Sequence, residues 1–240
     1  MGLWTARALV LAILVAFCGC GGNDAQEART PRPTSEASTT TTAPPPCGEE
    51  EAEAVTLTTP DGAELDAALV GSGDVGVVLG HQFRSDFCSW FPFAKQLAGR
   101  GIGVLAINFA STSLDDDMVA GARELQRRGA DRIIFAGASM GGTAALVAAG
   151  EIDVAGVAAL SAPREFSGLD ALPAVRRLEI PALFLVGRQD AGFVGDARRL
   201  YRAMASSSKD LVVTNGAEHG TDLLQDPEAE RTLLNFLARG

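Results

Sequence analysis

Residues 137–142 place a serine in a setting that suits nucleophilic chemistry. The segment reads Gly-Ala-Ser-Met-Gly-Gly; a β-branched apolar run precedes it and an alanine-rich run follows it, so a buried strand and then a helix are expected. A strand-to-helix turn of the form G-x-S-x-G exposes the serine oxygen, and its glycines let strand and helix pack closely. We therefore expect Ser139 to be a nucleophile, with the backbone N–H of Met140 facing a developing oxyanion. The alternative is a glycine-rich turn in which Ser139 only caps the helix.

A serine hydroxyl becomes a good nucleophile when a neighbouring base takes its proton. His219 follows a predicted strand, and Asp190 follows the strand before it in the chain. The carboxyl ends of parallel strands lie at one edge of a sheet, so Ser139, His219 and Asp190 are expected at that edge. Histidine can accept and return the proton, and a carboxylate on its far ring nitrogen orients the ring.

These residues belong to a chain in which strand and helix signals alternate after an opening hairpin. Helices are expected at 89–99, 115–128, 143–150, 194–204 and 226–237. Strands are expected at 54–59, 64–70, 75–80, 102–108, 131–136, 154–160, 180–186 and 211–214. This order predicts an α/β fold with a mostly parallel central sheet and helices on both faces.

Over residues 54–240 the sequence resembles the α/β-hydrolase family. The resemblance rests on the elbow at 137–141, the acid loop around Asp190 and the histidine loop around His219, in that chain order. It implies ester hydrolysis through an acyl-enzyme on Ser139, with no cofactor. Residues 161–178 are too few for a separate cap domain, so we expect an open site for small or accessible esters. The small, capless form resembles dienelactone-hydrolase-type enzymes, which commonly have cysteine where this chain has Ser139.

The loop after the strand at 75–80 is where the family donates a second oxyanion N–H, usually next to a His-Gly pair. Here the segment reads His81-Gln82-Phe83, so glutamine replaces that glycine. The N–H of Gln82 or of Phe83 is the implied donor, and we favour Phe83. His81 is expected to be a structural loop residue rather than the base. Two rivals to Asp190 remain open, Glu165 and Asp170, because some family members place the acid after the preceding strand.

Composition restricts the partners that can be expected. The formal net charge is −10 and no basic run is present, so no nucleic-acid partner is expected.

Individual residues that could suggest a further site have simpler explanations. The acidic residues Asp115, Asp116 and Asp117 are expected to interact favourably with the dipole at the start of a helix rather than to bind a metal, and no metal is expected. Arg84 is expected to be a solvated cation, the alternative being that it steers an anionic substrate. Three aromatic residues follow Arg84 in the chain: Trp90, Phe91 and Phe93. They are expected in the core, the alternative being that one of them forms a wall of the acyl site.

The first 20 residues are predicted to be a targeting segment. An apolar run at 8–17 has the length of a signal-peptide core. Cys20, preceded by Gly19, resembles the acylated cysteine of a bacterial lipoprotein signal and fits better than Cys18. An ordinary secretory signal cut nearby is the alternative. Either way we expect export, and lipidation would tether the protein to the outer face of the cytoplasmic membrane.

Residues 21–48 read as a Thr-, Pro- and Ser-rich linker, followed by one domain at 49–240. Cys47 and Cys88 are the two cysteines beyond the signal, and a pair in an oxidising compartment predicts a disulfide. The full set of residues predicts an exported serine hydrolase, most simply a carboxylesterase. Acyl transfer or peptidase action with the same residues is one alternative. A non-catalytic envelope binding protein that keeps the fold is another.

Overall fold

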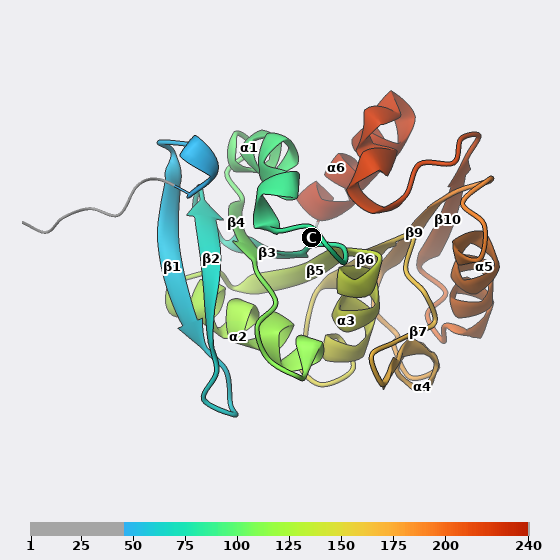
Figure 1. Cartoon of the computed structure of the whole chain (residues 1–240), viewed down its shortest axis with the longest axis horizontal. Coiled ribbons are helices and arrows are strands. Elements are labelled where there is room, and N and C mark those ends of the chain that lie inside the picture. The colour runs from blue at the N-terminus through green and yellow to red at the C-terminus, as the bar shows by residue number, and fades with distance from the viewer. Residues whose placement is uncertain (1–45, 240) are drawn as a thin grey trace, which may run out of the picture. The chain divides into compact units, whose positions relative to one another are not determined.

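The computed structural model of the chain describes residues 46–239, and an eight-stranded sheet lies at its centre (Figure 1). Its spatial order is β1-β2-β4-β3-β5-β6-β9-β10. The strands of the sheet are β1 (Ala52–Thr58), β2 (Glu64–Val70), β3 (Val75–Gly80), β4 (Gly103–Ile107), β5 (Arg132–Ala138), β6 (Gly156–Leu160), β9 (Ala182–Gly187) and β10 (Lys209–Thr214). The predicted signal segment, Cys20 and most of the predicted linker lie outside the described residues.

The two antiparallel pairings of the sheet lie at one edge, and β2 is the strand that runs opposite to the others. β1 pairs antiparallel with β2, and β2 pairs antiparallel with β4. Every other neighbouring pair, from β4 through β10, is parallel. The carboxyl ends of the parallel strands therefore share one edge of the sheet, and the predicted α/β class with a mostly parallel sheet is confirmed.

Helices cover both faces of the sheet because successive side chains of its central strands point to opposite sides. Ile133 and Phe135 of β5 pack in one apolar cluster, and Ile134 and Ala136 pack in the other. The first cluster includes α2 (Leu114–Arg127), α3 (Met140–Ala148), α4 (Ala171–Val175) and α5 (Phe193–Ala203). The second includes α1 (Phe91–Ala98) and α6 (Pro227–Arg239), which lie together in Figure 1.

The segment between β6 and β9, for which the sequence predicted no helix or strand, contains three short elements. It contains a ribbon of two short strands, β7 (Glu165–Phe166) and β8 (Leu169–Asp170), followed by α4. Two-residue strands carry no periodic pattern, so the sequence could not reveal them. The segment forms no separate cap domain. At the elbow, α3 begins at Met140, three residues before the predicted start, because the helix continues directly from the turn.

Two short 3-10 helices are joined by the predicted disulfide. Cys47 lies in η1 (Pro46–Gly48) and Cys88 in η2 (Phe87–Trp90), with their Cα atoms 5.6 Å apart. The N–H of Phe87 also donates to the Asn108 side chain at 3.0 Å, just after β4. The disulfide therefore ties the start of the described chain to the segment that follows β3. A third 3-10 helix, η3 (Gly220–Gln225), leads into α6.

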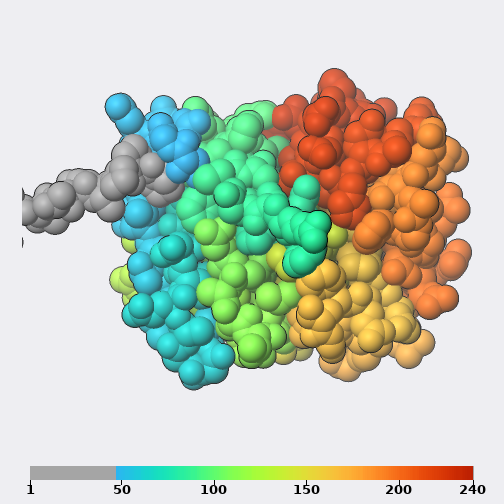
Figure 2. Space-filling view, in the orientation of Figure 1, coloured from blue at the N-terminus to red at the C-terminus, as the bar shows by residue number. Residues whose placement is uncertain are grey.

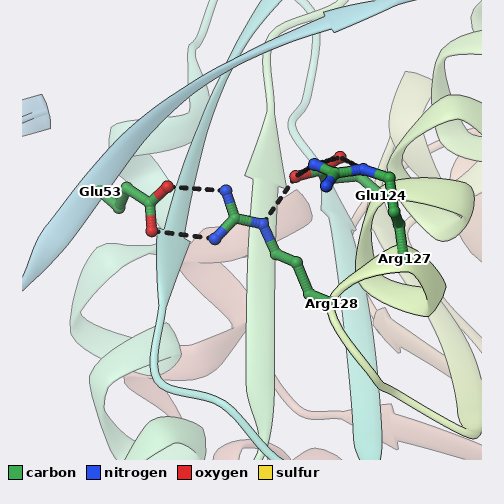
Figure 3. Close-up of polar contacts among 4 residues, drawn as sticks. All are labelled: Glu53, Glu124, Arg127 and Arg128. Carbon is green, nitrogen blue, oxygen red and sulfur yellow. Dashed lines mark hydrogen bonds and ion pairs between the residues drawn. The ribbon is translucent and has the colours of Figure 1, made fainter.

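A charged network links the edge strand β1 to the end of α2 (Figure 3). The guanidinium of Arg128 donates to both carboxylate oxygens of Glu53, at 2.6 and 2.9 Å, and to Glu124 at 2.6 Å. Arg127 donates to the same Glu124 carboxylate at 2.6–3.1 Å. Because an edge strand has only one strand neighbour, this network adds a second attachment for β1.

Among residues 46–239, no helix combines the length and apolarity needed to cross a bilayer.

Candidate active site

Ser139 lies at the sharp turn between β5 and α3, in a backbone conformation that serine rarely adopts. Its φ is 49° and its ψ is −115°. Such a conformation costs about 1–3 kcal/mol and persists where the surroundings enforce it. The Ser139 N–H donates to the Leu160 carbonyl at 2.7 Å, and the Ser139 carbonyl accepts from the N–H groups of Gly142 and Thr143. These bonds hold the serine between neighbouring strands and the first turn of the helix.

The two glycines of the motif are required by close backbone contacts. A Cβ at Gly137 would collide with the carbonyl of Gly141 and lie 2.6 Å from the Gly142 nitrogen. A Cβ at Gly141 would collide with the Gly80 carbonyl and lie 2.7 Å from the His81 oxygen. The spacing G-x-S-x-G therefore lets α3 approach both its own strand and the loop after β3.

Asp190 and His219 meet at the edge of the sheet where β9 and β10 end. His219 Nδ1 lies 2.9 Å from Asp190 Oδ2. Asp190 is 7% exposed, whereas the His219 side chain keeps 32% of its surface in solvent. The ring of Phe193, the first residue of α5, packs on the imidazole with the ring centroids 4.3 Å apart. The imidazole is thus oriented by a buried carboxylate and a neighbouring ring, with part of it open to solvent.

The rival acids lie in the β7–β8 ribbon and have other partners. Asp170 caps α4 by accepting from the Leu172 N–H at 2.9 Å. Glu165 pairs with Arg164 at 2.5 Å on the surface. The structure therefore brings Asp190, and neither rival, to the histidine.

The histidine loop reaches the elbow through Gly220. A Cβ built on Gly220 would lie 3.4 Å from the Cβ of Ala138, the residue before Ser139. Within residues 46–239, no hydrogen bond joins Ser139 to His219. The structure thus pairs Asp190 with His219 and sets their loop against the serine turn. Hydrogen bonds of this kind often tighten only when substrate binds.

Both ring nitrogens of His81 are occupied by the backbone. Nε2 lies 3.3 Å from the Phe109 N–H, which can only donate, so Nδ1 carries the proton and donates to the Gln82 carbonyl at 2.8 Å. Burial lowers the pKa of His81, which keeps the ring neutral. His81 is therefore a structural loop residue with no free nitrogen for proton transfer, in agreement with its expected role.

The loop at 81–86 follows β3 and faces the N-terminus of α3. Met140 is the first residue of α3, and its N–H donates to no group among residues 46–239. The buried Trp90 anchors the loop by donating from Nε1 to the Gly80 carbonyl at 3.1 Å. Phe91 and Phe93 are also buried, so all three predicted aromatic residues belong to the core.

Solved structures with this arrangement of strands and helices are numerous. An esterase from Pyrococcus furiosus superposes with a TM-score of 0.68 at 22% identity, covering 79% of this chain and 91% of that one. A dienelactone hydrolase from Anabaena variabilis superposes with a TM-score of 0.63 at 21% identity, covering 78% of this chain and 95% of that one. The chain has the α/β-hydrolase fold. A monoacylglycerol lipase from Paleococcus ferrophilus superposes with a TM-score of 0.63 at 20% identity, covering 74% of this chain and 99% of that one. No protein-family model matches the sequence, and a search of curated proteins finds no relative.

In this α/β-hydrolase fold an open cleft of about 430 Å³ lies beside Met140. Three aromatic side chains line it: Phe83, Phe109 and Phe166. Phe83 is 60% exposed and packs against Phe166 with ring centroids 5.9 Å apart. Arg84, also at the cleft, lies over the Phe83 ring at 5.6 Å. Trp90, Phe91 and Phe93 pack in the core, as expected, and none of them lines this cleft, so the alternative that one of them walls it is not supported.

Sequence reasoning missed two of these cleft residues. Phe109 comes two residues after β4, so the rule that selected Asp190 and His219 would also have found it. Phe166 lies in the β7–β8 ribbon, for which the sequence has no signal.

The acidic run at the start of α2 is not a uniformly solvated face. Asp117 is 0% exposed, and its Oδ2 accepts from the N–H groups of Ala110 and Ser111 at 3.0 and 3.2 Å. Burial raises the pKa of Asp117. The three acids lie in the first turn of α2, as expected, and the Asp117 carboxyl in addition holds the loop that carries Phe109. The described residues contain no group of three or more side chains arranged as metal ligands.

Proposed function

We propose that residues 49–240 form a serine hydrolase, specifically a carboxylesterase for small or accessible esters. The observation that carries the proposal is the turn at Ser139. Its strained backbone lies against the loop of His219, whose imidazole is paired with the Asp190 carboxylate. A helix cap needs no such strain and no such neighbour. The esterases and hydrolases with the same fold support this class of reaction.

The chemistry begins with attack of Ser139 Oγ on the ester carbonyl carbon while His219 Nε2 takes the hydroxyl proton. Asp190 keeps the other proton on Nδ1 and stabilises the imidazolium that forms. Collapse of the tetrahedral intermediate breaks the bond to the alcohol oxygen, which receives the proton from His219. A water molecule then attacks the acyl-enzyme by the same route and releases the acid.

Two backbone N–H groups would hold the oxyanion, those of Met140 and Phe83. In a trans peptide the carbonyl and the N–H point in opposite directions. The His81 carbonyl faces Gly141 of α3, so the Gln82 N–H points away from the elbow. The Gln82 carbonyl instead accepts from Ser85 N–H and His81 Nδ1, which leaves the Phe83 N–H as the donor of this loop.

The open cleft beside Met140 supports ester substrates that need no cap to enclose them. Its aromatic walls suit a short or compact acyl group, and its open form would leave most of a long lipid chain in contact with solvent. Acyl transfer and peptidase action use the same residues and would be recognised by product analysis. A binding protein without catalysis would need neither the strained serine nor the paired histidine.

We also propose that the protein is exported and anchored to the outer face of the cytoplasmic membrane through Cys20. The disulfide between Cys47 and Cys88 supports an oxidising compartment. Metabolic labelling with a palmitate analogue tests this. Incorporation into the wild type that is lost in Cys20→Ala supports the anchor, and equal labelling of Cys18→Ala would show that the other cysteine is not needed.

The proposed activity is tested with the purified protein, a fluorophosphonate probe and p-nitrophenyl butyrate. The wild type should label and hydrolyse the ester, and Ser139→Ala should do neither. Ser167→Ala is the matched control, because this serine also lies at the cleft and has no proposed role. A folded wild type that neither labels nor turns over the ester would favour the binding protein.

A further inference from the structure

We propose that the side chain of Gln82 is a positioning residue that joins the oxyanion loop (residues 81–86) to the histidine loop (residues 215–222). Its task is to keep the base and the Phe83 N–H at a constant separation. The catalytic roles of these two loops rest on the proposed function, whereas the contact between them is a property of the fold.

The contact consists of two hydrogen bonds to one oxygen. Gln82 Oε1 accepts from the Thr221 N–H at 2.8 Å and from Thr221 Oγ1 at 3.1 Å. A backbone N–H only donates, so the amide oxygen must face Thr221. Both residues are half-buried, which protects the bonds from competition by water. Thr221 is two residues beyond His219, so the bonds act close to the imidazole.

Gly220 makes room for this contact. Its φ is 61°, in the left-handed region, and a Cβ there would collide with Gln82 Oε1. The same Cβ would lie 3.4 Å from Ala138 Cβ. The histidine loop is therefore held between the elbow on one side and the Gln82 amide on the other.

Other contacts fix the imidazole, and among residues 46–239 the hydrogen bonds from its loop to the β9 side come from the acid turn. Asp190 and Phe193 hold the ring, and the Gln189 N–H donates to the Gly216 carbonyl at 2.9 Å. Among the described residues, two hydrogen bonds join the segment 219–225 to the oxyanion loop, and Gln82 Oε1 accepts both of them. Gln82 thus supplies the attachment to the β3 side.

One residue then serves both halves of the site. The carbonyl of Gln82 accepts from Ser85 N–H and His81 Nδ1, which sets the direction of the Phe83 N–H. Its side chain sets the position of the histidine loop. Figure 2 shows the blue-green segment that follows β3 lying against the red C-terminal segment that contains η3. A glycine at position 82, as in the usual family pattern, could make the first connection but not the second.

The test compares Gln82→Leu, which has no acceptor, with Gln82→Glu, which keeps an acceptor and adds charge. We expect Gln82→Leu to lower kcat for p-nitrophenyl butyrate by about 10- to 100-fold with little change in KM, because a misplaced catalytic group costs rate more than binding. Gln82→Glu should recover much of kcat and move the acid limb of the pH–rate profile to higher pH, because a carboxylate favours the imidazolium. Gln96→Leu is the matched control, since Gln96 bonds to Glu230 on the surface away from the site.

A readout independent of activity separates this proposal from the proposed function. Hydrogen–deuterium exchange of the peptide spanning residues 219–222 should be at least about tenfold faster in Gln82→Leu than in the wild type and in Gln96→Leu, because an amide loses its acceptor. Unchanged exchange would overturn the coupling whether or not the protein hydrolyses esters. Changed exchange with a wild type that does not label would overturn the proposed esterase alone. Equal kcat in Gln82→Leu and in an active wild type would overturn the positioning role.

Discussion

The imidazole of His219 lies 2.9 Å from the carboxylate of Asp190, although the two residues are 29 positions apart in the chain. They meet because β9 and β10 are adjacent parallel strands in register, with Gly187 opposite Thr214 at their carboxyl ends. A Cβ at Gly187 would lie 2.9 Å from the carbonyl oxygens of Gly216 and Glu218, so that glycine lets the acid turn and the histidine loop come together.

Asp190→Asn should lower kcat/KM for the ester by about 10³- to 10⁴-fold while leaving the fold intact. The asparagine amide can donate to Nδ1, which favours the ring tautomer that carries its proton on Nε2. That tautomer cannot accept the Ser139 proton. Steady-state kinetics, with circular dichroism as the check on folding, measure the effect.

Glu165→Gln and Asp170→Asn test the rival acids under the same assay. Both variants should keep kcat/KM within about twofold, because surface substitutions away from the reacting groups have small effects. Asparagine is also a good helix cap, so Asp170→Asn preserves the start of α4. A loss of activity in either rival that exceeds the loss in Asp190→Asn would reassign the acid.

Gly141→Ala should destabilise the protein by about 2–3 kcal/mol or more, because overpacking against fixed backbone forces both segments to shift. Gly195→Ala is the matched control. Gly195 lies in α5 with no atom within 4 Å of its built Cβ, so alanine there should stabilise by about 0.4–1 kcal/mol. Urea unfolding of both variants gives the comparison. Equal free energies of unfolding for the two variants would contradict the close contact at the elbow.

Removing the disulfide should lower the free energy of unfolding by about 4 kcal/mol, from the loop-closure entropy of a bridge between residues 41 positions apart. Cys47→Ser with Cys88→Ser is compared with the wild type by thermal unfolding, with and without reductant. Reductant should lower the Tm of the wild type and leave the double variant unchanged. A Tm of the oxidised wild type equal to that of the double variant would mean that the bridge does not stabilise this fold.

The network of Figure 3 should stabilise the protein above about pH 5 and lose its effect in acid. Hydrogen bonds from Arg128 lower the pKa of Glu53, and bonds from Arg128 and Arg127 lower the pKa of Glu124 although burial opposes them. A carboxyl group whose folded pKa is lowered stabilises the fold above its unfolded pKa, and that stabilisation is lost as the pH falls through the folded pKa.

We therefore expect Arg128→Met to cost about 1 kcal/mol at pH 7, since Arg128 and Glu53 remain partly exposed to solvent, and much less at pH 3. Urea unfolding at the two pH values measures the difference. Arg100→Met is the control, because Arg100 forms no ion pair within residues 46–239. A cost that is the same at both pH values would assign the effect to lost packing rather than to charge.

Local patterns in the sequence were sufficient to predict the sheet and the positions of Ser139, Asp190 and His219 at its carboxyl edge. The reason is physical: strand and turn signals span only a few residues, and parallel strands bring their ends together whatever their separation in the chain. The composition of the elbow also predicted its close packing, because only glycine tolerates such contacts.

Tertiary structure alone decided which side chains meet. It paired Asp190 rather than Glu165 with His219, and it brought Gln82 to Thr221 across 139 residues of chain. It also left Phe166 at the cleft. Such contacts depend on how loops from separate strands fold over the sheet, and no local preference of the chain encodes a distance between residues so far apart.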